Sequence, residues 1–277
     1  MPGGRGKLPT LICVLCLAAS IAMTGGGQAS EKFITLASTT STDNSGLFRY
    51  LLPKFTARSG VAVRVVAVGT GAALRLASRG DADAVLVHAP EQEKRFLAAG
   101  HGIGRQAVMH NDFVIVGPKS DPAGIRGVRS AAKVVTRLYQ AKALFASRGD
   151  RSGTHTKERA LWRSAGLDPL KFSGRWYLET GSGMGATLNF AAARGAYTLA
   201  DRATWLAFKN KRILALLAEG DKRPANPYGV IVVNPARHPG VKDREATMFA
   251  DWLMGTEGQA AIAAFRIKGK QVFFPGK

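Results

Sequence analysis

The sequence predicts an α/β protein that folds as two lobes. From residue 33 onward, short apolar runs rich in Val, Ile, Leu and Phe alternate with longer segments of helical period, which is typical of α/β folds with mainly parallel sheets. Hydrophobic residues make up 46% of the chain. About 250 residues follow the N-terminal segment described below, enough for one large core or two smaller ones.

The short apolar runs are the expected strands. They are Phe33–Ala37, Val61–Val68, Ala84–His88, Phe113–Val116, Leu144–Ala146, Trp176–Leu178, Tyr197–Leu199 and Gly229–Val233. The run Val61–Val68 is apolar except for Arg64. Such a run is expected of a strand that is covered on both faces.

The segments between the runs are the expected helices, and several carry end signals. Pro90 suits the first position of a helix, Glu91 suits its positive end, and Gly100 closes the segment. The segments Val241–Met254 and Glu257–Phe265 also have helical character. The C-terminus is therefore expected to be part of the fold.

The N-terminal segment has the composition of a secretory signal. Arg5 and Lys7 precede the apolar run Leu8–Met23, and small and polar residues follow up to Ala29. The run is too short and too poorly flanked to indicate a transmembrane span. We expect residues 1–29 to be a signal peptide cleaved near Ala29, which predicts a periplasmic protein.

Cleavage would also change the chemistry that the chain can perform. Cys13 and Cys16 both lie in the apolar run, so the mature chain would have no disulfide, thiol nucleophile or cysteine metal site.

The mature chain would keep 37 Lys and Arg residues against 19 Asp and Glu residues, a net charge of +18. This charge favours an anionic partner, although growth conditions or lineage would also account for it. Nucleic acid is not expected, because the basic residues are scattered and no base-reading motif occurs.

The division into lobes is marked by two passages. The strand Phe113–Val116 is followed by Gly117 and Pro118, which indicates an exit from the first lobe, and the stretch from Pro224 to Pro235 indicates the return. Lobe I is expected at 30–112 and 227–277, and lobe II at 113–226.

Four loops between a strand and a helix are rich in Gly, Ser and Thr and poor in carboxylates. They are Ser38–Gly46, Gly69–Gly71, Ser147–His155 and Gly181–Thr187. A helix N-terminus presents unpaired backbone N–H groups and a partial positive charge, so it binds oxyanions. In α/β sheets, ligands bind outside the carboxyl ends of the strands, where all four loops are expected. One such loop alone would be read as helix capping, but four together predict an oxyanion site.

Arg148 is the formal charge that we place on the anion. Asp150 stands two residues further on and can hold the guanidinium in position. The alternative is a surface ion pair, a common and individually weak interaction.

Seven sequence strings, taken in order, identify a family resemblance. They are LASTTSTDNSGL, VAVGTGAAL, GDADAVLVHAP, HNDFVIVGP, SRGDRSGTH, WYLETGSGMGATL and AYTLADR. Together they resemble the tungstate-binding component of ABC transporters, a branch of the phosphate- and molybdate-type periplasmic binding proteins. The resemblance implies the type II periplasmic-binding-protein fold, a Venus flytrap of two α/β lobes joined by two crossing segments. It also implies an ABC permease with its ATPase as partners, and a monomer is expected.

The resemblance also implies which residues bind the anion. They are Ser38, Thr39, Ser41, Thr70, Arg148, Ser152, Gly153, Thr154, Gly183, Met184, Gly185 and Tyr197, with Asp150 and His88 behind them. His88 stands about where phosphate binders have an aspartate. Phosphate still carries protons and gains from such an acceptor, whereas tungstate, molybdate and sulfate arrive fully deprotonated. This position therefore favours a deprotonated dianion, although His88 would equally suit a buried strand end.

Other functions fit the sequence less well. The string GSGMGA with Asp201 imitates a dinucleotide fingerprint but does not belong to the first strand–helix unit of its domain. No G-x-S-x-G elbow or histidine metal spacing occurs, so no enzyme, cofactor or metal ion is expected. Phosphate, molybdate or sulfate binding remains an alternative within the same fold. An exported hydrolase of phosphorylated or sulfated substrates is the alternative from another class.

Overall fold

The computed structural model describes residues 32–220 and 225–276, so the expected signal peptide lies outside the described residues. The strands are β1 Phe33–Thr39, β2 Ala62–Val68, β3 Ala84–Val87, β4 Gly102–Pro118, β5 Phe145–Ser147, β6 Tyr177–Glu179, β7 Thr198–Asp201, β8 Leu214–Ala218, β9 Ala225–Val233, β10 Arg266–Ile267, β11 Lys270–Gln271 and β12 Phe274–Pro275. The helices are α1 Thr40–Asn44, α2 Leu47–Ser59, α3 Thr70–Ser78, α4 Pro90–Ala98, α5 Ala131–Gln140, α6 Gly153–Ser164, the 3₁₀ helix η1 Pro169–Phe172, α7 Met184–Arg194, α8 Arg202–Ala207, α9 Asp243–Met254 and α10 Thr256–Ala264. None of these helices is long and apolar enough to cross a membrane.

One sheet runs in the order β12-β4-β9-β3-β1-β2. Strands β2 and β3 both pair with β1 in parallel, whereas β9 pairs antiparallel with β3 and β4, and β12 pairs antiparallel with β4. The expectation of mainly parallel sheets is therefore wrong for β9, β4 and β12, and it holds only for β1, β2 and β3. The α/β alternation in sequence predicts parallel neighbours, but β9 returns from a distant part of the chain and enters the sheet in the opposite direction.

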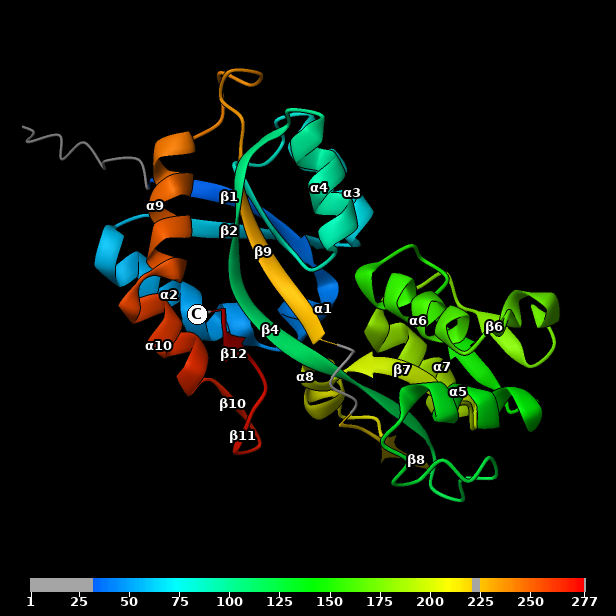
Figure 1. The fold of residues 1–277 in the computed structure, drawn as a ribbon. Coiled ribbons are helices and arrows are strands. Elements are labelled where there is room, and N and C mark those ends of the chain that lie inside the picture. Colours follow the sequence, from blue (N-terminus) through cyan, green and yellow to red (C-terminus); the bar gives the residue numbers. More distant parts are fainter. Residues whose placement is uncertain (1–31, 221–224, 277) are drawn as a thin grey trace, which may run out of the picture. The chain divides into compact units, whose positions relative to one another are not determined.

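Strand β4 belongs to two groups of paired strands (Figure 1). Its first part, 102–112, pairs with β9, and its second part, 113–118, pairs with β7 and β8. The apolar pattern predicts only the second part. The first part carries exposed and partly exposed polar residues such as Arg105 and Gln106, so it has no continuous apolar run. Strand β8 was not predicted either.

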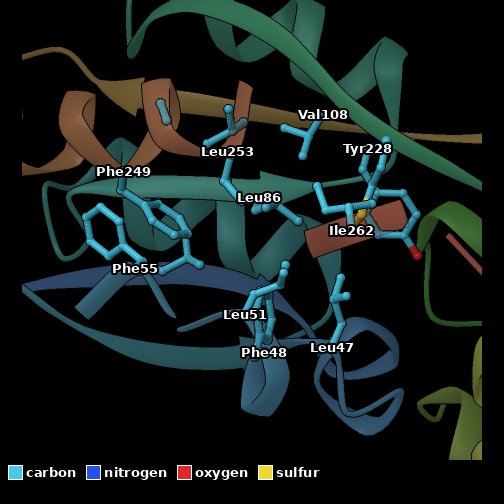
Figure 2. Packing of buried hydrophobic residues seen from close by; sticks show 14 of the residues in the cluster. Leu47, Phe48, Leu51, Phe55, Leu86, Val108, Tyr228, Phe249, Leu253 and Ile262 are labelled. Carbon is cyan, nitrogen blue, oxygen red and sulfur yellow. The ribbon is translucent and has the colours of Figure 1, made fainter. Parts of the chain in front are cut away.

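We call the part of the protein built on β1, β2, β3, β9 and the first part of β4 the first half. It has its own core around α2, α9 and α10 (Figure 2). Helix α2 is capped at its C-terminal end by Gly60, whose φ of +70° is readily adopted by glycine. The ring of Phe55 on α2 meets that of Phe249 on α9 edge to face, with the centroids 5.0 Å apart. Leu86 and Tyr228 bring β3 and β9 into the same cluster. This packing fixes the strands that carry the first two Ser/Thr loops.

A separate aromatic cluster forms the core of the second half. Phe145 on β5 packs edge to face against Trp162 on α6, with the centroids 5.3 Å apart, and stacks on Tyr177 of β6. Strand β5 pairs with β6 in parallel, as the alternating pattern predicts. This core holds the third loop between β5 and α6. The two groups of strands fit a fold of two α/β lobes, while the residue boundaries at 112/113 and 226/227 stay predictions.

Candidate functional site

Each of the four predicted loops stands at the beginning of a helix. Helices α1, α3, α6 and α7 begin at Thr40, Thr70, Gly153 and Met184. In the first sheet, Thr39 pairs with Val68 and Ser38 with Leu86 in parallel register. The first loop, the second loop and His88 therefore share one edge of the sheet, at the carboxyl ends of β1, β2 and β3.

A chain of buried hydroxyls occupies the first loop. Thr39 Oγ1 lies 2.7 Å from Thr42 Oγ1 and 3.1 Å from Ser41 Oγ. The imidazole of His88 closes this cluster, with Nε2 3.2 Å from Thr39 Oγ1 and 3.3 Å from Ser41 Oγ. Ser38 is turned away from the cluster, since its hydroxyl donates to Leu86 O at 2.6 Å.

Two asparagines fix the tautomer of His88. Asn226 donates from Nδ2 to Asn111 Oδ1 (2.8 Å) and to Tyr228 OH (3.3 Å), so its oxygen faces His88 Nδ1 at 2.9 Å and accepts from it. Burial, followed by the nearby charge of Arg148, lowers the pKa of His88 to about 4. The imidazole is therefore neutral near pH 7, and Nε2 is an acceptor. Only Nδ1 of the neutral ring donates, and the nitrogen that faces the hydroxyl cluster accepts.

The third loop supplies a buried cation. Arg148 is only 3% exposed, and its guanidinium pairs with Asp150 at 2.5 Å. Asp150 also accepts from the backbone N–H of Ser152 at 3.1 Å, so one carboxylate ties the guanidinium to the start of α6. Thr154 Oγ1 accepts from Arg148 at 3.4 Å. The hydroxyl hydrogen of Thr154 is thus left for another acceptor.

The third loop lies directly against the first half of the protein. A Cβ atom at Gly153 would fall 2.6 Å from the carbonyl oxygen of His88 and 2.8 Å from its Nδ1, so this close approach requires glycine. Next to it, Gln92 donates to the carbonyl of Arg151 at 3.3 Å. These contacts place the start of α6 beside the imidazole that holds the hydroxyl cluster.

The fourth loop also reaches the first loop. A Cβ at Gly183 would lie 3.3 Å from Thr40 Oγ1, and one at Gly185 would lie 3.7 Å from Asn44 Nδ2. The side chain of Met184 is fully buried in the core of the second half, so its backbone alone is available to a ligand. The first, third and fourth loops thus converge.

Thr70 and Asp201 each keep a buried polar atom without a hydrogen-bond partner among the described residues. Thr70 is 0% exposed, and its Oγ1 is unpaired at the start of α3. Asp201 Oδ1 accepts from Thr204 N at 2.8 Å, but Oδ2 is unpaired. Burial raises the pKa of Asp201, and hydrogen bonds from Thr204, followed by the charge of Arg148, oppose this shift. Thr204 in turn donates to Ser41 O at 3.3 Å, which places Asp201 close to the first loop.

Tyr197 does not join the converging loops. Its hydroxyl donates to Asp121 Oδ1 at 2.9 Å and accepts from Ala123 N at 3.0 Å, and its ring fills the space beside Gly117. The sequence analysis did not single out Thr42, Asn111, Asn226 or Tyr228, and it considered Asp201 only as part of an apparent dinucleotide fingerprint. Asparagines inside strands were the available signal, because a buried amide in a strand needs side-chain partners.

A buried carboxyl group lies behind the third loop. Glu158 on α6 accepts from Ser147 Oγ (2.8 Å), Tyr177 OH (2.7 Å) and Trp162 Nε1 (3.2 Å). Burial raises the pKa of Glu158 to about 7, although these three donors oppose the shift. Ser147 immediately precedes Arg148, so the network ties β5 to α6 at the root of the loop.

A pocket of about 390 Å³ adjoins the converging loops. Its lining includes His88 and Asn226 from the first half and Gly153 and Lys157 from α6. No group of His, Cys, Asp and Glu side chains that could hold a metal ion occurs within residues 32–220 and 225–276. The arrangement joins buried hydroxyls, backbone N–H groups at helix starts and one guanidinium, which is chemistry suited to a small oxyanion.

The fold and this site define the class of protein. The family model described as PBP superfamily domain matches residues 24–257. The chain is thus a mixed α/β binding protein of the periplasmic-binding-protein type, as the sequence predicts.

Three relatives narrow the class to a family. The tungstate-binding protein TupA of Peptoclostridium acidaminophilum is 42% identical over 234 residues, which cover 84% of this chain and 81% of the relative. The TupA structure from Desulfovibrio alaskensis is 43% identical, covers 88% of this chain and 98% of its own, and has a TM-score of 0.76. The structure of the tungstate ABC transporter from Geobacter sulfurreducens is 48% identical, with coverages of 85% and 99% and a TM-score of 0.79. The chain belongs to the TupA family of tungstate-binding proteins.

Proposed function

We propose that this chain is the solute-binding component of an ABC importer and that it binds tungstate. The three relatives described above are named for tungstate binding or tungstate transport, and they match this chain over most of its length. Two of them are named as tungstate-binding proteins and the third as a tungstate ABC transporter, which supports the prediction of a non-enzymatic protein and speaks against the exported hydrolase.

One observation carries the assignment of the site. Arg148 is buried where three loops rich in hydroxyls and backbone N–H groups converge, and its pairing with Asp150 fixes the direction of the guanidinium. A dianion needs charge-assisted hydrogen bonds to replace its water, and a buried guanidinium with hydroxyls and helix N-termini supplies them. We place the anion between Arg148, Ser152 and Thr154 on one side and Thr39 and Ser41 on the other.

The remaining predicted groups form the outer part of the proposed ligand set. Thr70 contributes its unpaired hydroxyl, and the starts of α6 and α7 contribute the backbone N–H groups of Gly153, Gly183, Met184 and Gly185. Ser38 and Tyr197 are left out, because their hydroxyls are committed to Leu86 and Asp121.

The transport context follows from the family. We propose that the protein works outside the cytoplasm, in the periplasm, after export directed by residues 1–29. A membrane permease and its ATPase would receive the anion. The binding unit would be a monomer whose lobes, with boundaries near 112/113 and 226/227, close on the anion.

Hydrogenphosphate is a second candidate ligand. Asp201 Oδ2 is a buried acceptor without a partner among the described residues, and a protonated oxyanion could donate to it. Tungstate has no proton to donate near neutral pH and would be repelled by an ionised Asp201. The raised pKa of Asp201 reduces this repulsion.

Calorimetric titration of the mature protein with tungstate, molybdate, sulfate and phosphate at pH 7.5 tests the proposal. We expect tungstate and molybdate to bind far more tightly than sulfate or phosphate. The matched variant Asp201→Asn should keep tungstate binding, because it removes repulsion. Tightest binding of phosphate, lost in Asp201→Asn, would establish the second candidate instead, and no binding of any of the four anions would overturn both.

A further inference from the structure

In the free protein, His88 competes with an anion for the hydroxyl hydrogens of Thr39 and Ser41. His88 donates from Nδ1 to Asn226, so Nε2 of the neutral ring can only accept. Its neighbours at hydrogen-bond distance are the hydroxyls of Thr39 and Ser41. Each hydroxyl has one hydrogen atom. A hydroxyl that donates to the imidazole cannot donate to an oxyanion at the same time.

We propose that His88 takes up a proton when the oxyanion binds, and that the imidazolium then reverses the direction of its hydrogen bond to the hydroxyl cluster. Nε2–H would donate to the oxygen of Thr39 or Ser41, and the freed hydroxyl hydrogens would turn to the anion. The proton comes from solvent and stays on Nε2, and no covalent bond other than N–H forms. The inference rests on the proposed function, because it requires an anion beside these hydroxyls.

The charges that face His88 explain why the proton arrives with the anion. From the third loop, Arg148 repels a protonated imidazole, and burial adds to this cost, so the free protein keeps the ring neutral. From β9, the ring of Tyr228 lies 4.7 Å away and is neutral, because burial raises its pKa. A bound dianion brings two negative charges to the hydroxyls that touch Nε2. The field at the ring then favours the imidazolium.

Groups on the neighbouring helices do not supply this charge. Glu91 and Arg95 on α4 and Lys157 on α6 line the same pocket as His88. Their formal charges sum to a positive value, so they do not favour the imidazolium in the free protein. Asp201, on β7, has a raised pKa and lies near Arg148. The bound anion is therefore the group that shifts the protonation equilibrium of His88 toward the imidazolium.

The coupling predicts a direction for the pH dependence. The pKa of His88 is about 4 in the free protein and is higher in the complex, so the complex holds more protons between these two values. Affinity for tungstate should rise as the pH falls through the higher value, by up to about tenfold per pH unit, and level off near pH 4. A site made of hydroxyls and Arg148 alone would show no such rise.

Nitrogen NMR of histidine-labelled protein tests the proton directly. At pH 6.5 we expect the free protein to show His88 as the neutral ring protonated at Nδ1, and the tungstate-saturated protein to show it protonated at both nitrogens. His110, an exposed residue that stacks on Phe274, is the internal control and should not respond. A neutral His88 ring in the saturated complex would overturn the proposal.

Calorimetry in buffers of different ionisation enthalpy gives a second, independent measurement. At pH 6.5 the wild-type protein should take up a substantial fraction of one proton per tungstate, and His110→Gln should behave in the same way. His88→Gln should bind more weakly and take up almost none. Undiminished uptake in His88→Gln would assign the proton to another group, such as Glu158, and refute the inference. Failure of the wild-type protein to bind tungstate would instead overturn the proposed function.

Discussion

The two sides of the candidate site differ in charge. The side formed by β1, β3 and β9 is neutral: Thr39, Ser41, His88 and Asn226 are buried and bonded to one another. The side formed by β5 and α6 carries the charge of Arg148. In the proposed site, the neutral side would supply shape and hydrogen-bond donors, while the charged side would supply most of the attraction for the anion. Substitutions on the two sides should therefore differ in size and in pH dependence.

The largest effect is expected from the carboxyl group behind the charged side. The pKa of Glu158 is raised from 4.5 to about 7, so between these values the folded protein binds more protons than the unfolded chain. Stability therefore falls as the pH rises from about 4.5 to 7 and is constant above, with a loss on the order of 3 kcal/mol. Glu158→Gln should remove this slope in urea unfolding measured from pH 5 to 8, and the exposed control Glu91→Gln should keep it. A variant that retains the wild-type slope would show that Glu158 is not the group responsible.

The next effect separates the two sides through binding. Arg148→Ala should weaken tungstate binding by about 1.5–3 kcal/mol, or one to two decades in Kd, because a charge-assisted hydrogen bond is lost. Calorimetry at pH 7.5 measures it, with Arg79→Ala as the control, since Arg79 pairs with Asp81 on the surface. Equal affinity in wild type and Arg148→Ala would remove the charged side from the site.

A third test acts on the contact between the sides. Gly153→Ala would place a methyl group against the backbone of His88, and overpacking of this kind costs about 1–3 kcal/mol. We expect a loss of tungstate affinity of roughly tenfold, because the two sides of the site can no longer approach as closely. Gly185→Ala is the matched control, because its Cβ would meet Asn44 at an ordinary 3.7 Å. Similar affinities for the two variants would show that the close approach at Gly153 is not needed for binding.

The smallest effect is expected at the second loop, which follows β2 next to the neutral side. Thr70→Val removes an unpaired buried hydroxyl while keeping its shape, so it should cost about 0.5–1.5 kcal/mol of tungstate binding. Stability should not fall, since no protein hydrogen bond among the described residues is lost. A lower melting temperature together with unchanged affinity would mean that Thr70 has a structural role instead.

The sequence predicts the elements that follow local rules. The eight apolar runs all overlap strands, and the four Ser/Thr loops all stand at helix starts, because apolar period and capping residues act over a few positions. The position of Arg148 within such a loop was predicted for the same reason. Pro90 begins α4, as its fixed backbone angle predicts.

Features that depend on long-range pairing were not predicted. Asn111 and Asn226 face each other only because β4 pairs with β9, across more than a hundred residues. Neither has a local signal beyond an amide in a strand. The first part of β4 is polar, and β8, with the sequence LALLA, is short enough to suit either a strand or a helix. The tautomer of His88 depends on the same pairing, because Asn111 orients Asn226 and Asn226 accepts from Nδ1.

The pairing of β4 with β9 also bears on the order in which the protein folds during synthesis. The second half of the protein is one contiguous segment that runs from the end of β4 to β8. It can therefore pack as soon as this segment leaves the ribosome. The sheet of the first half has to wait for residues 225–233 and 274–275, although β1, β2 and β3 are made first. Until then β3 and β4 present open edges to the solvent, so a delay near the end of translation would leave the N-terminal strands exposed to aggregation.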